Sequence, residues 1–163
     1  MDNGGDIHTW NDAPIRNVVS KGNYSTLKVL LEKGANPHIH DDHMLIIASS
    51  KGYVEIVKLL LDEGLDVHTR DDYALQRACF YGHFDTVKLL IDNGSNVRAN
   101  DDYSVKYASS SGHMDVVHLL LENGANIHAG GDMALRLALC NERYNVIKLL
   151  LQRGSDINAA MCS

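Results

Sequence analysis

Glycine recurs every 30 residues along this chain, and this spacing constrains the fold more than any other feature. The recurring positions are Gly4, Gly34, Gly64, Gly94, Gly124 and Gly154. Alanine keeps the same period at Ala48, Ala78, Ala108 and Ala138, without a single insertion. Self-similarity at a fixed interval of this size is the signature of repeat proteins. The sequence therefore predicts a row of similar units, each packed only on its neighbours.

Apolar residues fall into columns when the chain is aligned on this period. One column is Ile15, Leu45, Leu75, Val105 and Leu135, a second is Leu27, Val57, Val87, Val117 and Ile147, and a third is Leu30, Leu60, Leu90, Leu120 and Leu150. Each unit then carries two apolar segments, such as 74–81 and 84–93 in the middle of the chain. Such segments are too short to stand alone as helices in water. Neighbouring units must supply the missing contacts.

Turn residues separate the segments and indicate a helix-turn-helix unit. Gly52, Gly82 and Gly112 lie between the two segments, and the Gly34 column follows the second, where a left-handed residue commonly ends a helix. Aspartate precedes the first segment, where its carboxylate is expected to cap the N-terminus of its own helix; these residues are Asp42, Asp72, Asp102 and Asp132.

The pattern predicts an all-α solenoid of five helix-turn-helix units. Their expected boundaries are 11–40, 41–70, 71–100, 101–130 and 131–160. Residues 1–10 are interpreted as the tail of a preceding or incomplete unit, and 161–163 as a C-terminal tail.

The third unit carries motifs of a known repeat family. These are Gly82-His83, the run from Val87 to Leu90, and the closing Gly94-Ser95-Asn96-Val97. In these residues the unit at 71–94 resembles the ankyrin repeat, and the resemblance extends over nearly the whole chain. It implies a module that binds other proteins through the concave side of the array.

Two departures from the ankyrin pattern stand out. Ankyrin units usually have 33 residues, and the shorter period here implies that the β-hairpins linking the units are shortened or absent. The Thr-Pro-Leu-His signature is also degraded, because Ala13-Pro14-Ile15-Arg16 comes closest and Tyr73-Ala74-Leu75-Gln76 keeps only the leucine. In this form the chain is similar to ankyrin proteins of giant DNA viruses such as mimivirus.

Charge and cysteine content narrow the partners and the compartment. The formal net charge is -6, so the chain as a whole lacks the positive field that attracts nucleic acid or anionic membranes. Three cysteines, Cys79, Cys140 and Cys162, share no metal or redox spacing and are expected to be free thiols in a reducing compartment. No apolar run approaches the length of a membrane span, and the N-terminus does not resemble a signal peptide. An intracellular, cytoplasmic location is therefore expected, in the host cytoplasm if the protein is viral.

Histidine and aspartate patterns raise the question of metal binding. The column His8, His38, His68 and His128 cannot share one ion between units, because packed helices lie about 8–10 Å apart and zinc needs ligands at about 2 Å. We expect these rings to bond the backbone of the turns between units. The doubled aspartates, as at 71–72, offer too few oxygens for calcium. The dense segment from His38 to His43 leaves metal binding open as a minor alternative.

Catalytic motifs are not found in the sequence. It contains no phosphate loop, dinucleotide turn, H-E-x-x-H or G-x-S-x-G pattern. The residues that depart from the period, among them Arg77, Tyr107 and Glu142-Arg143, do not form a nucleophile and base pair. The sequence therefore predicts that the chain is not an enzyme and has no cofactor.

The leading functional hypothesis is a protein-binding module. Residues before the glycine between the helices face the groove in ankyrin repeats, and matching positions here hold Phe80 and Tyr81 where other units have small or polar residues. The candidate partner-binding residues are Phe80, Tyr81, Tyr73, Tyr103, Arg70, Trp10, His40 and Lys51. Aromatic and arginine side chains are frequent anchors of protein interfaces. The partner itself is not identified by the sequence, and a host protein is a candidate if the viral resemblance holds.

Other interpretations stay open. In one alternative, Phe80 and Tyr81 only cover their own unit, where the shortened hairpin leaves apolar surface. In another, the array is a structural segment that associates weakly end to end, because the last unit keeps Val146, Ile147, Leu149, Leu150 and Leu151 as internal units do. A metal-binding or enzymatic domain is the weakest alternative.

Overall fold

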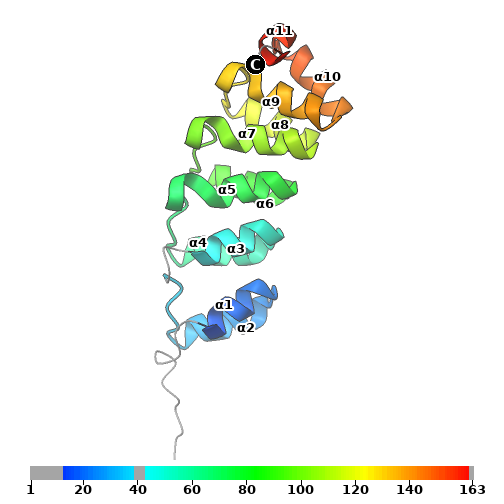
Figure 1. Cartoon of the computed structure of the whole chain (residues 1–163). Coiled ribbons are helices and arrows are strands. Elements are labelled where there is room, and N and C mark those ends of the chain that lie inside the picture. The colour runs from blue at the N-terminus through cyan, green and yellow to red at the C-terminus, as the bar shows by residue number, and fades with distance from the viewer. Residues whose placement is uncertain (1–12, 39–42, 162–163) are drawn as a thin grey trace, which may run out of the picture.

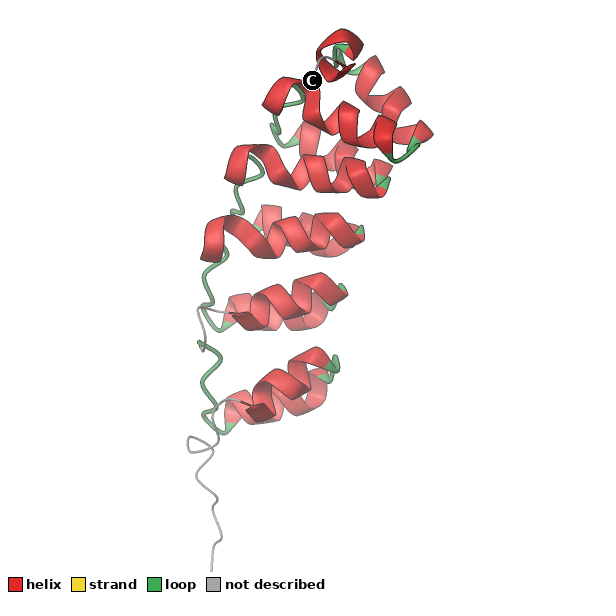
Figure 2. Ribbon diagram, in the orientation of Figure 1, coloured by secondary structure: helices red, strands yellow, loops and turns green. Residues whose placement is uncertain are grey.

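Helices stacked in pairs make up the described part of the chain, residues 13–38 and 43–161 of this computed structural model (Figure 1). The first helices of the pairs are α1 (Ala13–Ser20), α3 (His43–Lys51), α5 (Thr69–Tyr81), α7 (Ala99–Ser111) and α9 (Ala129–Cys140). The second helices are α2 (Tyr24–Glu32), α4 (Val54–Asp62), α6 (Phe84–Asp92), α8 (Met114–Glu122) and α10 (Tyr144–Gln152). The predicted all-helical solenoid is confirmed. Within the described ranges the segments that join the pairs contain no strand (Figure 2).

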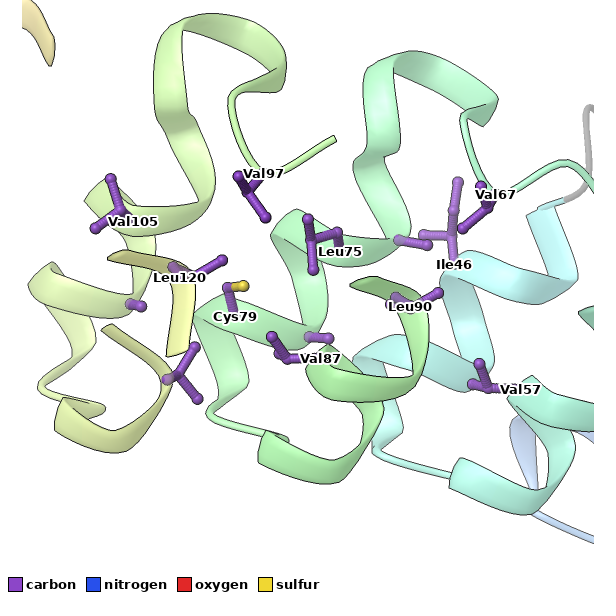
Figure 3. Packing of buried hydrophobic residues seen from close by; sticks show 14 of the residues in the cluster. Ile46, Val57, Val67, Leu75, Cys79, Val87, Leu90, Val97, Val105 and Leu120 are labelled. Carbon is purple, nitrogen blue, oxygen red and sulfur yellow. The ribbon is translucent and has the colours of Figure 1, made fainter. Parts of the chain in front are cut away.

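The apolar columns form one continuous core along the stack. Leu75 and Leu90 in the third unit are fully buried, as are their equivalents Leu135 and Leu150 in the fifth. Figure 3 shows such side chains directed into the space between helices of neighbouring units. The sequence period thus places an apolar residue wherever two units meet.

The two rows of helices do not pack equally closely. Contacts between neighbouring first helices, such as α5 and α7, are more extensive than contacts between neighbouring second helices, such as α6 and α8. The first helices therefore form the more extensively packed row of the array.

A left-handed turn stands at the start of α5, α7 and α9. In α5 the φ angles of Arg70, Asp71 and Asp72 are 53°, 56° and 58°, and residues 100–102 and 130–132 repeat this conformation. Left-handed backbone costs most residues about 1–2 kcal/mol each, and Asp, Asn and Gly tolerate it best. This turn takes the place of the hairpin that a longer unit would have.

The aspartate at the end of this turn links one unit to the next. The Asp72 carboxylate is buried and accepts a hydrogen bond of 2.8 Å from the backbone N–H of Asn96, a residue 24 positions later. Asp102 and Asp132 make the same contact with Asn126 and Asp156. The prediction that these aspartates cap their own helices is therefore wrong. Asp42 lies outside the described residues.

The histidine column has two kinds of contact. His38 Nε2 donates to the carbonyl oxygen of Glu63 at 3.3 Å, in the turn after α4, as predicted. His68 and His128 instead donate from Nδ1 to the carboxylates of Asp72 and Asp132, each at 3.2 Å. For these two rings the prediction of a backbone partner is wrong, because the buried carboxylate four residues later is the stronger acceptor.

The glycine between the two helices of a pair lies under a side chain of the next unit. Gly82 has a φ of 74°, and a Cβ there would overlap the ring of His113. The same ring donates from Nε2 to the carbonyl oxygen of Phe80 at 3.1 Å. Gly52 and His83 repeat this arrangement one unit earlier. The histidine of each Gly-His motif therefore covers the glycine of the preceding unit.

A short eleventh helix, α11 (Ile157–Met161), follows the last pair and was not predicted. It packs against α9, and its Ala160 is buried. Because it stands where the left-handed turn begins in earlier units, it covers part of the core at the end of the described chain.

Candidate protein-binding surface

Aromatic side chains gather on the first helices of the third and fourth units. Phe80 meets Tyr81 edge to face at a centroid distance of 5.1 Å and meets Tyr107 of α7 in the same way at 5.8 Å. Tyr107 in turn lies 5.4 Å from Tyr103. Edge-to-face and tilted pairs at such distances are favourable beyond the area they bury. The rings therefore form one continuous surface across two units.

Arg77 joins the rings that belong to α5. Its guanidinium carbon lies 5.9 Å from the ring centre of Tyr73, 5.6 Å from that of Phe80 and 4.9 Å from that of Tyr81. It also donates a hydrogen bond of 2.8 Å from Nη2 to the Tyr81 hydroxyl. These cation–π contacts and the hydrogen bond restrict the orientation of the Tyr81 ring.

We refer to Tyr73, Arg77, Phe80, Tyr81, Tyr103 and Tyr107 as the aromatic cluster. Three of its members stay substantially accessible: Phe80 is 38% exposed, Tyr81 45% and Tyr103 43%. Beneath Tyr103, the ammonium of the buried Lys106 lies 5.3 Å from the ring centre and 2.6 Å from Asp101 Oδ2. Lys106 thus supports Tyr103 on its buried side, while Phe80, Tyr81 and Tyr103 remain accessible to solvent.

Four of the predicted residues come together in this cluster: Phe80, Tyr81, Tyr73 and Tyr103. The other candidates do not join them. Lys51 lies in the last turn of α3, one unit away, and Arg70 lies in the left-handed turn at the other end of α5 from Tyr81. Trp10 and His40 lie outside the described residues.

Arg77 and Tyr107 belong to the cluster although they were not among the candidate residues. Both occupy one column of the period, whose other members are Asn17, Ile47 and Leu137. The sequence shows that these two positions depart from the period. It does not show that an arginine in one unit and a tyrosine in the next would both contact Phe80.

The interpretation that Phe80 and Tyr81 only cover their own unit accounts for part of their contacts. Phe80 also packs on Tyr107 of the following unit. Phe80 and Tyr81 each remain more than a third exposed. Behind them, Leu75, Ala78 and Cys79 are already fully buried. Covering the third unit therefore does not account for the whole of either side chain.

Metal-ligating groups and the buried Cys79 bear on the alternatives to protein binding. No group of three or more His, Cys, Asp or Glu side chains that could hold a metal ion lies within residues 13–38 and 43–161. The segment from His38 to His43 falls largely outside these ranges, so metal binding there stays a prediction. Burial raises the pKa of the Cys79 thiol far above its usual range, which makes this sulfur a poor nucleophile.

One of the surface depressions lies on the second helices, between α6 and α8, and has a volume of about 340 Å³. It is shallow and open, and His118 and Glu122 on its wall contact each other at 3.3 Å. Its lining residues, Phe84, Asp115, His118, Leu119 and Glu122, include no serine, threonine, cysteine or lysine. In the part of the chain that the structure describes, every helix is too short or too polar to cross a membrane.

The stacked helix pairs, with their core shared between units, define a helical repeat protein of the solenoid class. A family model described as ankyrin repeats in three copies matches residues 15–101 and again 98–161, and the chain belongs to the ankyrin repeat family. Compared with curated proteins, the chain shows no match. Ankyrin repeats are generally protein–protein interaction modules and are typically not enzymes.

Proposed function

We propose that this chain is a non-catalytic module that binds a protein partner through the exposed side of its first helices, centred on the aromatic cluster. The observation that carries the proposal is a continuous surface of five rings and one guanidinium that spans two units and remains open to solvent. Clustered aromatic and arginine side chains are the most frequent energetic centres of protein interfaces.

The repeat itself does not need these side chains. At the position of Phe80 the other units have serine or cysteine, and at the position of Tyr81 they have Lys21, Lys51, Ser111 and Asn141. All of these units form the same helix pair around the same core columns. An exposed aromatic pair that the fold does not require is best explained by a role in binding.

The test is a loss of binding without a loss of stability. Folded protein is used to select ligands from a displayed library of random peptides, and the dissociation constants of the best clones are measured. We expect Phe80→Ala with Tyr81→Ala to weaken binding by about 2 kcal/mol or more, while the melting temperature changes little. Phe84→Ala is the matched control, because Phe84 is 40% exposed but lies on a second helix. A double variant that binds as tightly as the parent, or that unfolds, contradicts the proposal.

Self-association is the second candidate function. Three apolar side chains near the end of the described chain are exposed: Leu151 40%, Ile157 43% and Met161 73%. Stacking of one array on another would cover them. Sedimentation at increasing protein concentration tests this directly, since Ile157→Ser with Met161→Ser should abolish any concentration-dependent oligomer.

The resemblance to giant-virus ankyrin proteins extends the proposal to the setting of the interaction. On this basis the partner is a host protein and the binding takes place in the host cytoplasm. Immunoprecipitation of the tagged chain from the cytoplasm of infected and of uninfected cells tests both points.

A further inference from the structure

We infer that the partner segment bound by the first helices is acidic, with carboxylates that pair with lysines in line with Tyr81. This inference rests on the proposed function and adds the chemistry of the partner to it. Its basis is the distribution of charge between the two rows of helices.

The right-handed parts of the first helices contain no acidic residue. Segments 14–21, 43–51, 73–81, 103–111 and 133–140 carry only basic charges, which are Arg16, Lys21, Lys51, Arg77, Lys106 and Arg136. The second helices carry seven acidic residues, Glu32, Glu55, Asp62, Asp85, Asp92, Asp115 and Glu122, against the four lysines Lys28, Lys58, Lys88 and Lys148. Away from their left-handed turns, which carry Asp71, Asp72, Asp101, Asp102 and Asp132, the first helices are therefore basic in a chain whose net charge is -6.

Lys21 and Lys51 are the basic groups best placed to meet a ligand. Both are exposed, and both occupy the same column of the period as Tyr81, at the last turn of their helices or just after it. Neither makes an ion pair with a described residue. Lys106, by contrast, is buried and already paired with Asp101. Lys21, Lys51 and Tyr81 thus form a line across the first three units, with the aromatic cluster at one end and the two lysine ammonium groups beyond it.

Exposed acidic side chains near this line belong to the second helices: Glu55 and Asp85 lie in the first turns of α4 and α6, four residues after Lys51 and Tyr81. The aspartates of the first helices lie elsewhere or are already engaged. Asp72, Asp102 and Asp132 are buried and accept hydrogen bonds from the following units, and Asp101 pairs with Lys106. The exposed Asp71 lies at the start of α5, the opposite end from Tyr81. The C-terminal carbonyls of the helices carry a partial negative charge, but those of Ser50 and Phe80 already accept from His83 and His113. The full positive charges at this end of the first helices are therefore those of Lys21 and Lys51, while Glu55 and Asp85 stand across the turn on the second helices.

The spacing of the line fits an extended peptide. Neighbouring packed helices lie about 8–10 Å apart. A segment in the extended polyproline II conformation advances about 3.1 Å per residue with three residues per turn, so that every third side chain lies on the same side. A segment lying across the units would then bring every third residue to the next site. We expect an apolar or aromatic residue at the aromatic cluster, followed at intervals of about three residues by Glu or Asp opposite Lys51 and Lys21.

Single-stranded nucleic acid is the rival ligand for a basic and aromatic surface. Two exposed lysines neutralise few phosphates, and the acidic second helices add an unfavourable field around any long polyanion. A short protein segment avoids that field and can place a side chain between the rings. The observations therefore favour an acidic protein segment.

Charge reversal of Lys21 and Lys51, at the ends of the first helices in the first two units, tests the inference. The probe is a set of 12-residue peptides selected from the random library and labelled with a fluorophore. We expect the selected peptides to be rich in Asp and Glu, and their affinity to fall as salt rises. Lys21→Glu with Lys51→Glu should weaken binding about tenfold or more. The control is Lys28→Glu with Lys58→Glu, the same charge change in the same units but on the second helices, which should leave affinity unchanged.

The outcomes separate this inference from the proposed function. One outcome is that the peptides bind the Phe80→Ala, Tyr81→Ala variant more weakly but are neutral or basic, or bind the Lys21→Glu, Lys51→Glu variant as tightly as the parent. This outcome overturns the inference and leaves the proposed function in place. Peptides indifferent to both pairs, or a selection that yields no binder, overturn both. A mixed-sequence single-stranded oligonucleotide that displaces the peptide at lower concentration than unlabelled peptide does would replace the acidic segment by nucleic acid.

Discussion

The third helix pair (α5 and α6) and the fifth (α9 and α10) share the same core but differ in residues whose backbone is left-handed. In the third unit Gly82 has a positive φ and lies beneath His113 of the next unit. At the equivalent place in the fifth unit, Glu142 has a φ of 56° and an exposed side chain. The comparison indicates two reasons for the periodic glycine: it adopts a left-handed conformation, and it leaves room for a side chain of the next unit. Glu142 shares only the left-handed conformation, and its side chain is exposed.

The accessibility of cysteine gives the largest expected difference between the two units. Cys79 is fully buried and Cys140 is exposed. In a Cys162→Ser background at pH 8, we expect a thiol reagent to modify Cys140 on the order of 1,000 times faster or more than Cys79, which reacts only when the stack opens. The raised pKa of Cys79 slows it further, since only the thiolate reacts. Mass spectrometry of timed samples measures both rates, and similar rates under native conditions would refute the burial of Cys79.

Core truncation should separate the units by several kcal/mol. Leu90→Ala should lower the free energy of unfolding by about 2–5 kcal/mol, because Leu90 is fully buried in a unit with neighbours on both sides. Leu150 is equally buried, but within residues 13–38 and 43–161 its helix α10 packs on a single second helix, α8. We expect Leu150→Ala to cost less and to unfold the last unit locally. Urea denaturation and hydrogen exchange measure the two effects, and equal global losses would contradict nearest-neighbour stacking.

Replacement of the periodic glycine should show what the neighbour adds. Gly82→Ala is expected to cost about 2–4 kcal/mol, the sum of left-handed strain and of the overlap with His113. Gly94→Ala supplies the control, because Gly94 also has a positive φ but a Cβ there would meet no atom within 4 Å. It should cost about 1 kcal/mol. Thermal unfolding compares them, and an equal cost at both glycines would show that His113 moves aside freely.

Restoring the period in the fifth unit should have the smallest effect. Glu142→Gly relieves the left-handed strain at that residue and should stabilise the chain by about 1 kcal/mol. Glu142→Ala retains the Cβ and should change stability by less than half of that. The same denaturation experiment measures both variants, and a destabilised Glu142→Gly protein would contradict the interpretation of Glu142 as strained.

The helix pairs and their core could be predicted from the sequence because the period repeats every apolar column five times. The left-handed turn and its aspartate could not. An aspartate before an apolar segment suits both a helix cap and a left-handed residue, and only the position of the following unit shows that Asp72 bonds Asn96. His68 was assigned the wrong partner for the same reason, since its acceptor is that buried carboxylate.

The candidate surface was predictable where a residue departed from its column. Phe80 and Tyr81 stand out against serines and lysines, and the structure places them in the aromatic cluster with Tyr73 and Tyr103. The part played by Arg77 was not predictable, because the reach of its guanidinium over three rings depends on side-chain directions that the period does not determine.

The aspartate bridge has a consequence for how such a chain can change over generations. Asp72, Asp102 and Asp132 each bond a backbone N–H 24 residues ahead, so the donor and the acceptor recur at the same places in these three units. Duplication or loss of one 30-residue block would bring an equivalent donor to an equivalent acceptor, and the bridge would re-form across the new junction. The array can lengthen or shorten without redesign of its joints. The aromatic cluster lacks this freedom, because it exists only while the third and fourth units remain adjacent.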